Sequence, residues 1–168
     1  LLLSGGVIET HADTEGAGHF VVGERGVAAL SIPSGHANIA GAFTSAVYES
    51  QATITQSGGI LEANELLLGG IGASTYSLTG DGVVAARGAM VRARQTGSTS
   101  SFTQIGGDVS LSTSNAAVGR LGLQIGERGS ANYTISGGTL DVPGAVWIAG
   151  QGGSQGEMMI AGGAVHIG

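Results

Sequence analysis

Carboxylates are the side chains in this sequence best suited to acid–base chemistry, and there are twelve of them. A glycosidase uses two carboxylates beside the bond it cleaves, one as acid and the other as base or nucleophile. The densest acidic group, Glu9, Asp13 and Glu15, lies between two apolar runs and is typical of an exposed turn. Three more aspartates could hold a cation or a sugar if they stack on one face: Asp81, Asp108 and Asp141. Solvated corner residues are the simpler interpretation, so the sequence predicts no catalytic site.

Other reactive side chains favour neither a metal site nor covalent catalysis. The histidines lack the spacing of a zinc site, and cysteine is absent. The closest match to a calcium-binding glycine-rich nonapeptide, residues 69–74, has serine where the carboxylate should be. No Gly-x-Ser-x-Gly elbow or phosphate-binding loop occurs. We therefore expect no enzyme activity, no metal and no cofactor.

Three arginines and the single tryptophan are the residues best suited to contacting a partner. Arg92 and Arg94 alternate with apolar residues and share an outer strand face, and Arg87 lies nearby in sequence. Such a cluster suits an acidic glycan or another acidic partner, although a solvated strand face is the common alternative. Alternation also places Trp147 outward, where an indole can mark an interface or stack on a sugar unless a neighbouring loop covers it.

Composition excludes several classes of protein. Glycine supplies 33 of 168 residues, but it has no period of three and proline occurs only twice, so the chain is not collagen. An apolar fraction of 42% is too high for simple disorder. Only 11% of residues are charged, the net charge is −6 and lysine is absent, which disfavours nucleic-acid binding. No run of 18 apolar residues predicts a transmembrane helix.

A repeat marked by glycine pairs organises the chain. The chain opens with the same pattern at Leu1, looser copies begin at Ile32 and Tyr76, and the first glycines recur at intervals of 22 to 31 residues. Each copy precedes an apolar run that ends in glycine, and Gly-Glu-Arg-Gly occurs at 23–26 and at 126–129. The uneven spacing indicates similar coils joined by turns of variable length. The clearest copies are 54–59 (ITQSGG), 102–107 (FTQIGG), 133–138 (YTISGG) and 158–163 (MMIAGG).

The best-preserved unit, 131–156, contains three short runs in which apolar and polar residues alternate. This period of two is the pattern of β-strands, and glycine or proline separates the runs. One coil cannot bury its apolar face alone, whereas stacked coils pair in parallel and build a continuous core. The sequence therefore predicts an all-β parallel β-solenoid over 1–168, with about six to seven irregular coils of three short strands. Its inward residues should include Ile135, Leu140, Val142, Val146 and Ile148.

Two other folds fit less well. A short helix is conceivable over Ala42–Gln51, within the longest glycine-free run, but the glycine content disfavours a helical protein. An antiparallel sandwich needs hairpin turns, and Asp81-Gly82 is the only dipeptide of the Asn-Gly or Asp-Gly type.

The repeats resemble the glycine-rich repeats of autotransporter passenger domains and related bacterial surface proteins. The resemblance rests on 54–59, 102–107 and 133–142 (YTISGGTLDV) and covers most of the chain, with 30–52 the poorest match. It implies a right-handed parallel β-helix, export through a bacterial envelope, and a role at the cell surface as an adhesin or structural fibre.

We therefore expect a non-catalytic scaffold, fibre or adhesin segment, secreted or on the bacterial cell surface. The alternatives are a carbohydrate-active β-helix lyase or hydrolase and an ice-binding solenoid, which needs regular Thr-x-Thr rows of which only Thr53-Ile54-Thr55 is clear. Both ends fall within coils and show no cap, so we expect the solenoid to continue in a longer chain or by head-to-tail stacking of copies. The expected partners are the protein itself and host or environmental glycans; we expect no nucleic-acid partner and no transmembrane segment.

Overall fold

The alternation of apolar and small polar residues produces strands in the structure, a computed structural model that describes residues 1–12, 18–87, 89–112 and 121–168. In β13 (Ser130–Ile135), Ala131, Tyr133 and Ile135 are buried while the residues between them face outward. Among the described residues there is no helix, and all strand pairs are parallel. The predicted all-β parallel solenoid is therefore confirmed.

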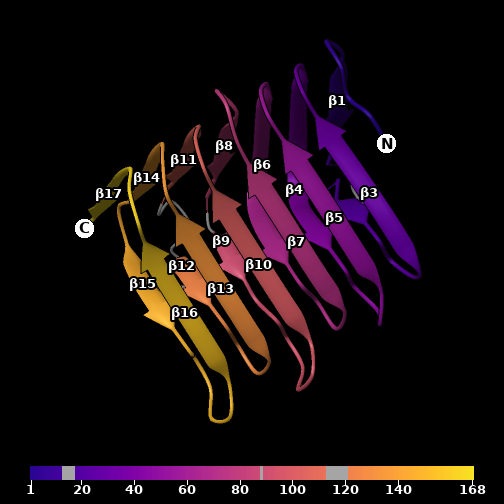
Figure 1. The fold of residues 1–168 in the computed structure, drawn as a ribbon. Helices are drawn as coiled ribbons and strands as arrows, with labels where there is room; N and C mark the ends of the chain where they lie inside the picture. The colour runs from indigo at the N-terminus through magenta and orange to yellow at the C-terminus, as the bar shows by residue number, and fades with distance from the viewer. Residues whose placement is uncertain (13–17, 88, 113–120) are drawn as a thin grey trace.

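The strands form two sheets. The front sheet of Figure 1 has six strands in the order β16 (Gln155–Ile160), β13, β10 (Thr99–Gln104), β7 (Ala73–Leu78), β5 (Gln51–Gln56) and β3 (Val27–Ile32). The back sheet has eleven strands: β15 (Ala145–Ile148), β12 (Leu121–Ile125), β9 (Ala89–Val91), β6 (Ile60–Leu68), β8 (Val83–Ala86), β11 (Asp108–Leu111), β14 (Thr139–Val142), β17 (Ala164–Ile167), β4 (His36–Ser45), β1 (Val7–Thr10) and β2 (Phe20–Val22).

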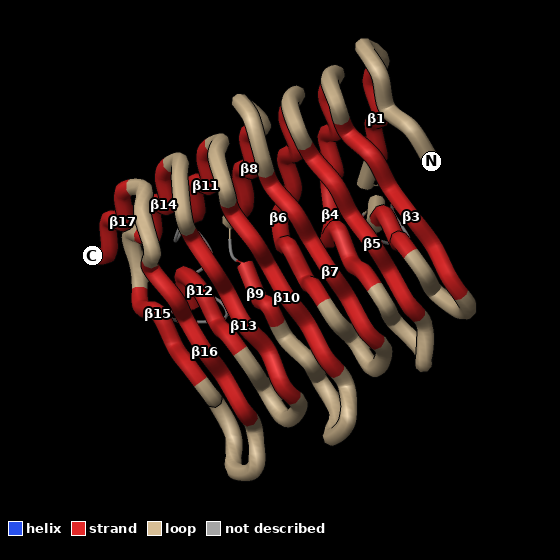
Figure 2. The backbone as a smooth tube through the Cα atoms, in the orientation of Figure 1, coloured by secondary structure: helices blue, strands red, loops and turns tan. Residues whose placement is uncertain are grey.

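The chain winds as a right-handed coil of about six turns. In Figure 1 it rises along each front strand, crosses over the top, descends through the back sheet and returns one place nearer the C-terminus. Three strands per coil are found in β7-β8-β9, β10-β11-β12 and β13-β14-β15. In two coils the second and third strands are joined into the long strands β4 and β6, which lie behind the front sheet in Figure 2.

The segment 42–51, for which the sequence left a short helix open, is not helical. Strand β4 continues through Ser45 and β5 begins at Gln51. Phe43 lies in register with Phe20 of one neighbouring coil and Leu66 of the other, so the segment is an ordinary repeat. The sequence comparison missed it because Ala46 stands where two other coils have Gly23 and Gly69.

The glycine pairs turn the chain from the front sheet to the back sheet, and glycine is required at the two positions for different reasons. A Cβ atom on Gly106 would lie 2.8 Å from the carbonyl oxygen of Gly80 in the preceding coil. Gly107 has a φ of 71°, in the left-handed region that glycine adopts without steric penalty. The first glycine therefore permits close stacking of the coils and the second makes the turn.

A stack of aromatic rings fills the centre of the core. Tyr76, Phe102 and Tyr133 lie in register on β7, β10 and β13, and successive ring centroids are 4.7 Å apart with nearly parallel planes. All three side chains are almost fully buried. Parallel pairing places each residue over its counterpart one strand spacing away, about 4.8 Å, so the rings stack face to face.

Each tyrosine hydroxyl in this stack is held by a glutamine of the preceding coil. Tyr133 donates to Oε1 of Gln104 at 2.8 Å, and Nε2 of Gln104 donates to the carbonyl oxygens of Gly107 at 3.0 Å and Thr139 at 2.9 Å. Tyr76 and Gln56 make the same set of contacts with Gly59 and Val83. Burial raises the pKa of both phenols above its usual value, so the hydroxyls remain protonated donors. We call each unit a tyrosine–glutamine clamp.

Where a coil lacks the glutamine of the clamp, the next coil also lacks the tyrosine, and apolar residues occupy both positions. Gln56 and Gln104 occupy matching positions but are separated in register by Leu78, so their amides do not stack on each other. Leu78 precedes Phe102, which has no hydroxyl to satisfy. Along the solenoid the successive pairs are Gln56 with Tyr76, Leu78 with Phe102, Gln104 with Tyr133, and Ile135 with Met158.

The predicted inward residues are mostly confirmed. Ile135, Leu140 and Val142 are fully buried, and Val146 packs partly against the core. Ile148 is 47% exposed, because β15 has a neighbouring strand on one side only.

The clamp predicts a coupled pair of substitutions. Gln104→Leu should lower the free energy of unfolding by about 1–3 kcal/mol, because the Tyr133 hydroxyl and two carbonyl groups lose their partners. Adding Tyr133→Phe should restore much of that loss, since the pair then matches Leu78 and Phe102. Urea unfolding of the two single variants and the double variant measures the coupling. As a control, Phe102→Tyr alone should destabilise the chain, whereas strictly additive effects of the first two changes would contradict the clamp.

Candidate functional site

The corner that leads from the back sheet to the front sheet carries most of the arginines that the structure describes. Each coil begins this corner with a left-handed glycine or alanine, and the two types alternate along the series: Gly23, Ala46, Gly69, Ala93, Gly126 and Ala149. Four of the corners contain a second left-handed residue farther along, namely Gly26, Glu49, Gly97 and Gly153. Next to this corner, the front strands carry a row of small residues in register: Ala28, Ala52, Ser74, Ser100, Ala131 and Gly156. A Cβ atom on Gly69 would lie 2.8 Å from Cβ of Ser100, so the corner is packed closely against this row.

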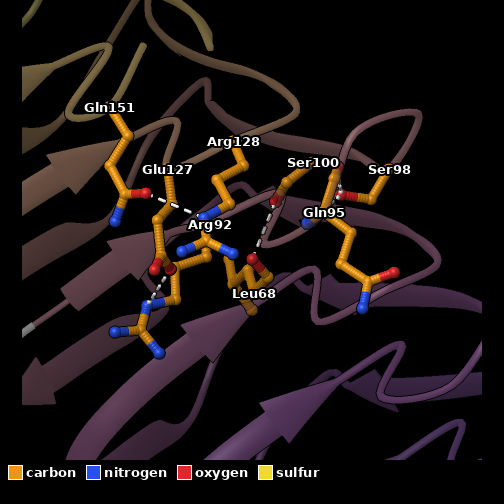
Figure 3. Close-up of polar contacts among 8 residues, drawn as sticks. All are labelled: Leu68, Arg92, Gln95, Ser98, Ser100, Glu127, Arg128 and Gln151. Atoms are coloured by element: carbon orange, nitrogen blue, oxygen red, sulfur yellow. Dashed lines mark hydrogen bonds and ion pairs between the residues drawn. The ribbon is translucent and has the colours of Figure 1, made fainter. Parts of the chain in front are cut away.

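Two of the predicted arginines project from this corner and have different surroundings. Arg92 lies with its Nε 3.0 Å from Oε2 of Glu127 in the next coil, and both side chains are largely covered, at 27% and 15% exposure. Neither of these two atoms makes a hydrogen bond, so the contact is an electrostatic pair. Arg94 is exposed and forms no ion pair with a carboxylate of the described residues. Figure 3 shows the Arg92–Glu127 pair beside Arg128, which donates to Gln151.

Arg92 and Arg94 line one small pocket of about 120 Å³, which we call the arginine pocket. Tyr48 lines the same pocket, and Arg25 lies over its ring at 5.0 Å from the centroid, a cation–π contact. The remaining lining is mostly apolar or glycine: Thr44, Val47, Leu67, Gly69, Gly70 and Ile71. The pocket therefore combines an unpaired guanidinium with an aromatic and aliphatic wall.

The other two predicted contact residues lie outside this pocket. Arg87 is exposed and follows β8, and the whole of β9 separates it from Arg92. Trp147 faces outward as predicted, with 42% of its surface exposed, and lies in register with Gln124 on the outer face of the back sheet. The four residues thus form no single site.

Sequence reasoning missed Tyr48 and Arg25, although a signal for them exists. Each lies two residues after a left-handed corner residue, Ala46 and Gly23, and Ile71 occupies the same position after Gly69. An alignment that allowed alanine for glycine at the corner would have brought the three positions together.

The candidate carboxylates do not form the ladder considered from the sequence. Asp108 lies in register with Val83 and Thr139, whereas Asp141 lies in register with Ser110. Asp13 and Glu15 lie outside the described residues. Within the described residues, no group of three or more histidine, cysteine, aspartate or glutamate side chains could hold a metal ion, and no helix could span a membrane.

The outer face of the front sheet carries more hydroxyl groups in register than the sequence indicated. Thr53, Thr75 and Ser101 form one row, and Thr55, Ser77 and Thr103 form a second. Ala29 and Asn132 end the first row after three strands, whereas Ser31 and Thr134 extend the second to five, so the two rows run side by side over three strands. An open groove of about 570 Å³ crosses this face over β7, β10, β13 and β16, with mostly polar lining.

Comparison with known proteins assigns no family to the chain. No protein-family model matches the sequence, and neither curated proteins nor solved structures give a significant match. The resemblance of the repeats to autotransporter passenger domains therefore stays a prediction.

The two arginines of the pocket should differ in their contribution to stability. Arg92→Gln should lower the free energy of unfolding by about 1–2 kcal/mol, between the values for exposed and buried ion pairs, because it leaves Glu127 covered and unpaired. Arg94→Gln should change it by less than about 0.5 kcal/mol, since Arg94 is exposed. Chemical denaturation of both variants tests this difference, and equal effects would show that the Arg92–Glu127 pair has no structural role.

Proposed function

We propose that this chain is a non-catalytic structural segment of an extracellular bacterial surface protein, acting as a scaffold, fibre or adhesin. The observation that carries the proposal is the set of inward ladders, which run through all coils and end in exposed apolar side chains. Leu1 is 70% exposed at one edge, and Ile160 and Ile167 are 58% and 54% exposed at the other. These residues continue the buried ladders of Leu30, Ile135 and Val142.

An edge of this kind suits the addition of another coil. The last strands, β16, β15 and β17, each have a neighbour on one side only, which leaves backbone N–H and C=O groups unpaired along the edge. A further coil of the same kind would satisfy those groups and cover the apolar side chains. Because the contact is heterologous, repetition of it extends a rod instead of closing a ring. A rod extended in this way fits a role in projecting from a surface.

The outer faces support a scaffold in preference to the alternative functions. Two of the three aspartates that could have stacked to hold a cation or a sugar, Asp108 and Asp141, lie in different rows of the back sheet. Ice binding would need two hydroxyl rows side by side along the sheet, and the two rows run together over three strands only. We therefore propose that the rod itself acts as the scaffold and that its corners bind the ligand.

The proposal predicts association through the edge. The mean mass of the 168-residue chain measured by light scattering should rise with concentration. Ile160→Lys should suppress the rise, because it places a charge in the apolar ladder at the edge. Met159→Lys, on the outer side of the same strand and similarly exposed, is the matched control and should leave association unchanged.

A monomer whose mass is independent of concentration would contradict edge stacking. Reproducible turnover of a polysaccharide that is lost on substitution of Asp108 or Asp141 would favour the lyase or hydrolase alternative. Thermal hysteresis that is lost on substitution of Thr75 would favour ice binding.

A further inference from the structure

We infer that the arginine pocket binds one acidic sugar unit, a uronic acid or similar carboxylate-bearing saccharide, with Arg94 on the carboxylate and Tyr48 against the ring. This inference deepens the adhesin role proposed above by naming a ligand class, and it rests on that role only for its biological setting. The binding itself is argued from the side chains of the pocket.

The charge in the pocket selects for an anion. The Glu127 carboxylate, 3.0 Å from Nε of Arg92, neutralises that guanidinium. Arg94 lines the same pocket with no carboxylate of the described residues within ion-pair distance. Its planar guanidinium offers several N–H donors that match the two oxygens of a carboxylate. The unpaired positive charge of the pocket therefore lies at Arg94.

The aromatic and aliphatic wall of the pocket suits the apolar face of a sugar ring. Tyr48 is 45% exposed, and Arg25 lies over its ring at 5.0 Å and restrains it. Leu67 and Ile71 extend the apolar surface beside the tyrosine, and Thr44 adds a hydroxyl group. An aromatic ring presents a flat face for stacking, while the few polar groups set the orientation of the ligand. An aspartate or glutamate side chain would use the guanidinium but leave this wall without a contact.

The size of the pocket limits the ligand to a single unit. Drug-sized ligands occupy sites of about 300–1,000 Å³, whereas this pocket has about 120 Å³. The ligand is therefore a terminal or branching acidic sugar, or one residue of a polyuronide that passes over the corner. A single unit binds weakly, and a repeated polysaccharide gains affinity when several copies of the site act together.

The test uses the 168-residue chain with galacturonic acid, and galactose as the neutral counterpart, followed by NMR titration. Galacturonic acid should bind, and galactose should bind about tenfold more weakly, because the charge-assisted hydrogen bond to Arg94 is lost. Arg94→Gln should reduce the affinity for galacturonic acid to that for galactose. Tyr48→Ala should weaken binding of both sugars. Arg87→Gln, which removes an exposed arginine outside the pocket, is the control and should leave both affinities unchanged.

Several results would overturn the inference. Equal binding of the two sugars by the unchanged chain would remove the role of the charge. An equal loss in Arg87→Gln and Arg94→Gln would show a diffuse electrostatic effect. An acidic peptide such as hexa-aspartate that binds as tightly as oligogalacturonate would assign the pocket to a protein partner. Failure to bind sugar leaves the edge-stacking test of the proposed function unaffected, so the two hypotheses can fail separately.

Discussion

Two buried tyrosine hydroxyls in the centre of the solenoid are the constraint on which the rest of the structure depends. A hydroxyl in an apolar core without a partner is strongly unfavourable, and stacking on Phe102 offers no acceptor. The chain supplies the acceptor from the preceding coil, through Gln104 for Tyr133 and Gln56 for Tyr76. The same amides bind carbonyl groups of two successive coils. One side chain therefore fixes ring position, corner geometry and the register between coils.

Because the register between coils is fixed by inward side chains, the residues on the outer surface are free to vary. Inward positions must match the coils above and below, and the corner needs glycine or alanine in a left-handed conformation beside a row of small residues. Outward positions carry no such requirement, and the segments that form the corners differ in sequence from coil to coil. The arginine pocket is formed largely by these corner segments, and Tyr48 and Arg94 come from corners two coils apart. A repetitive scaffold can thus acquire a local binding site without disturbing its core.

The sequence predicted the features that depend on local pattern and missed those that depend on register. Alternation and glycine pairs gave the strands, the inward residues Ile135, Leu140 and Val142, and the parallel coil. The strand segment around Phe43 was missed because Ala46 stands where the two neighbouring coils have Gly23 and Gly69. The ladder considered as an alternative for Asp81, Asp108 and Asp141 is not formed by Asp108 and Asp141, since similar places after a glycine pair do not guarantee the same row. Tyr48, Arg25 and Arg94 are far apart in sequence, and only the stacking of coils brings them to one corner.

The most direct test of this account is a nuclear Overhauser measurement on the aromatic rings. The chain has three phenylalanines and three tyrosines, so the ring signals can be assigned by single substitutions. The account predicts contacts from the Phe102 ring to the rings of both Tyr76 and Tyr133, whose centroids lie 4.7 Å away on either side. It predicts no contact from Phe102 to the exposed Tyr48. Contacts to only one of the buried tyrosines, or a direct contact between Tyr76 and Tyr133, would contradict the register on which the solenoid depends.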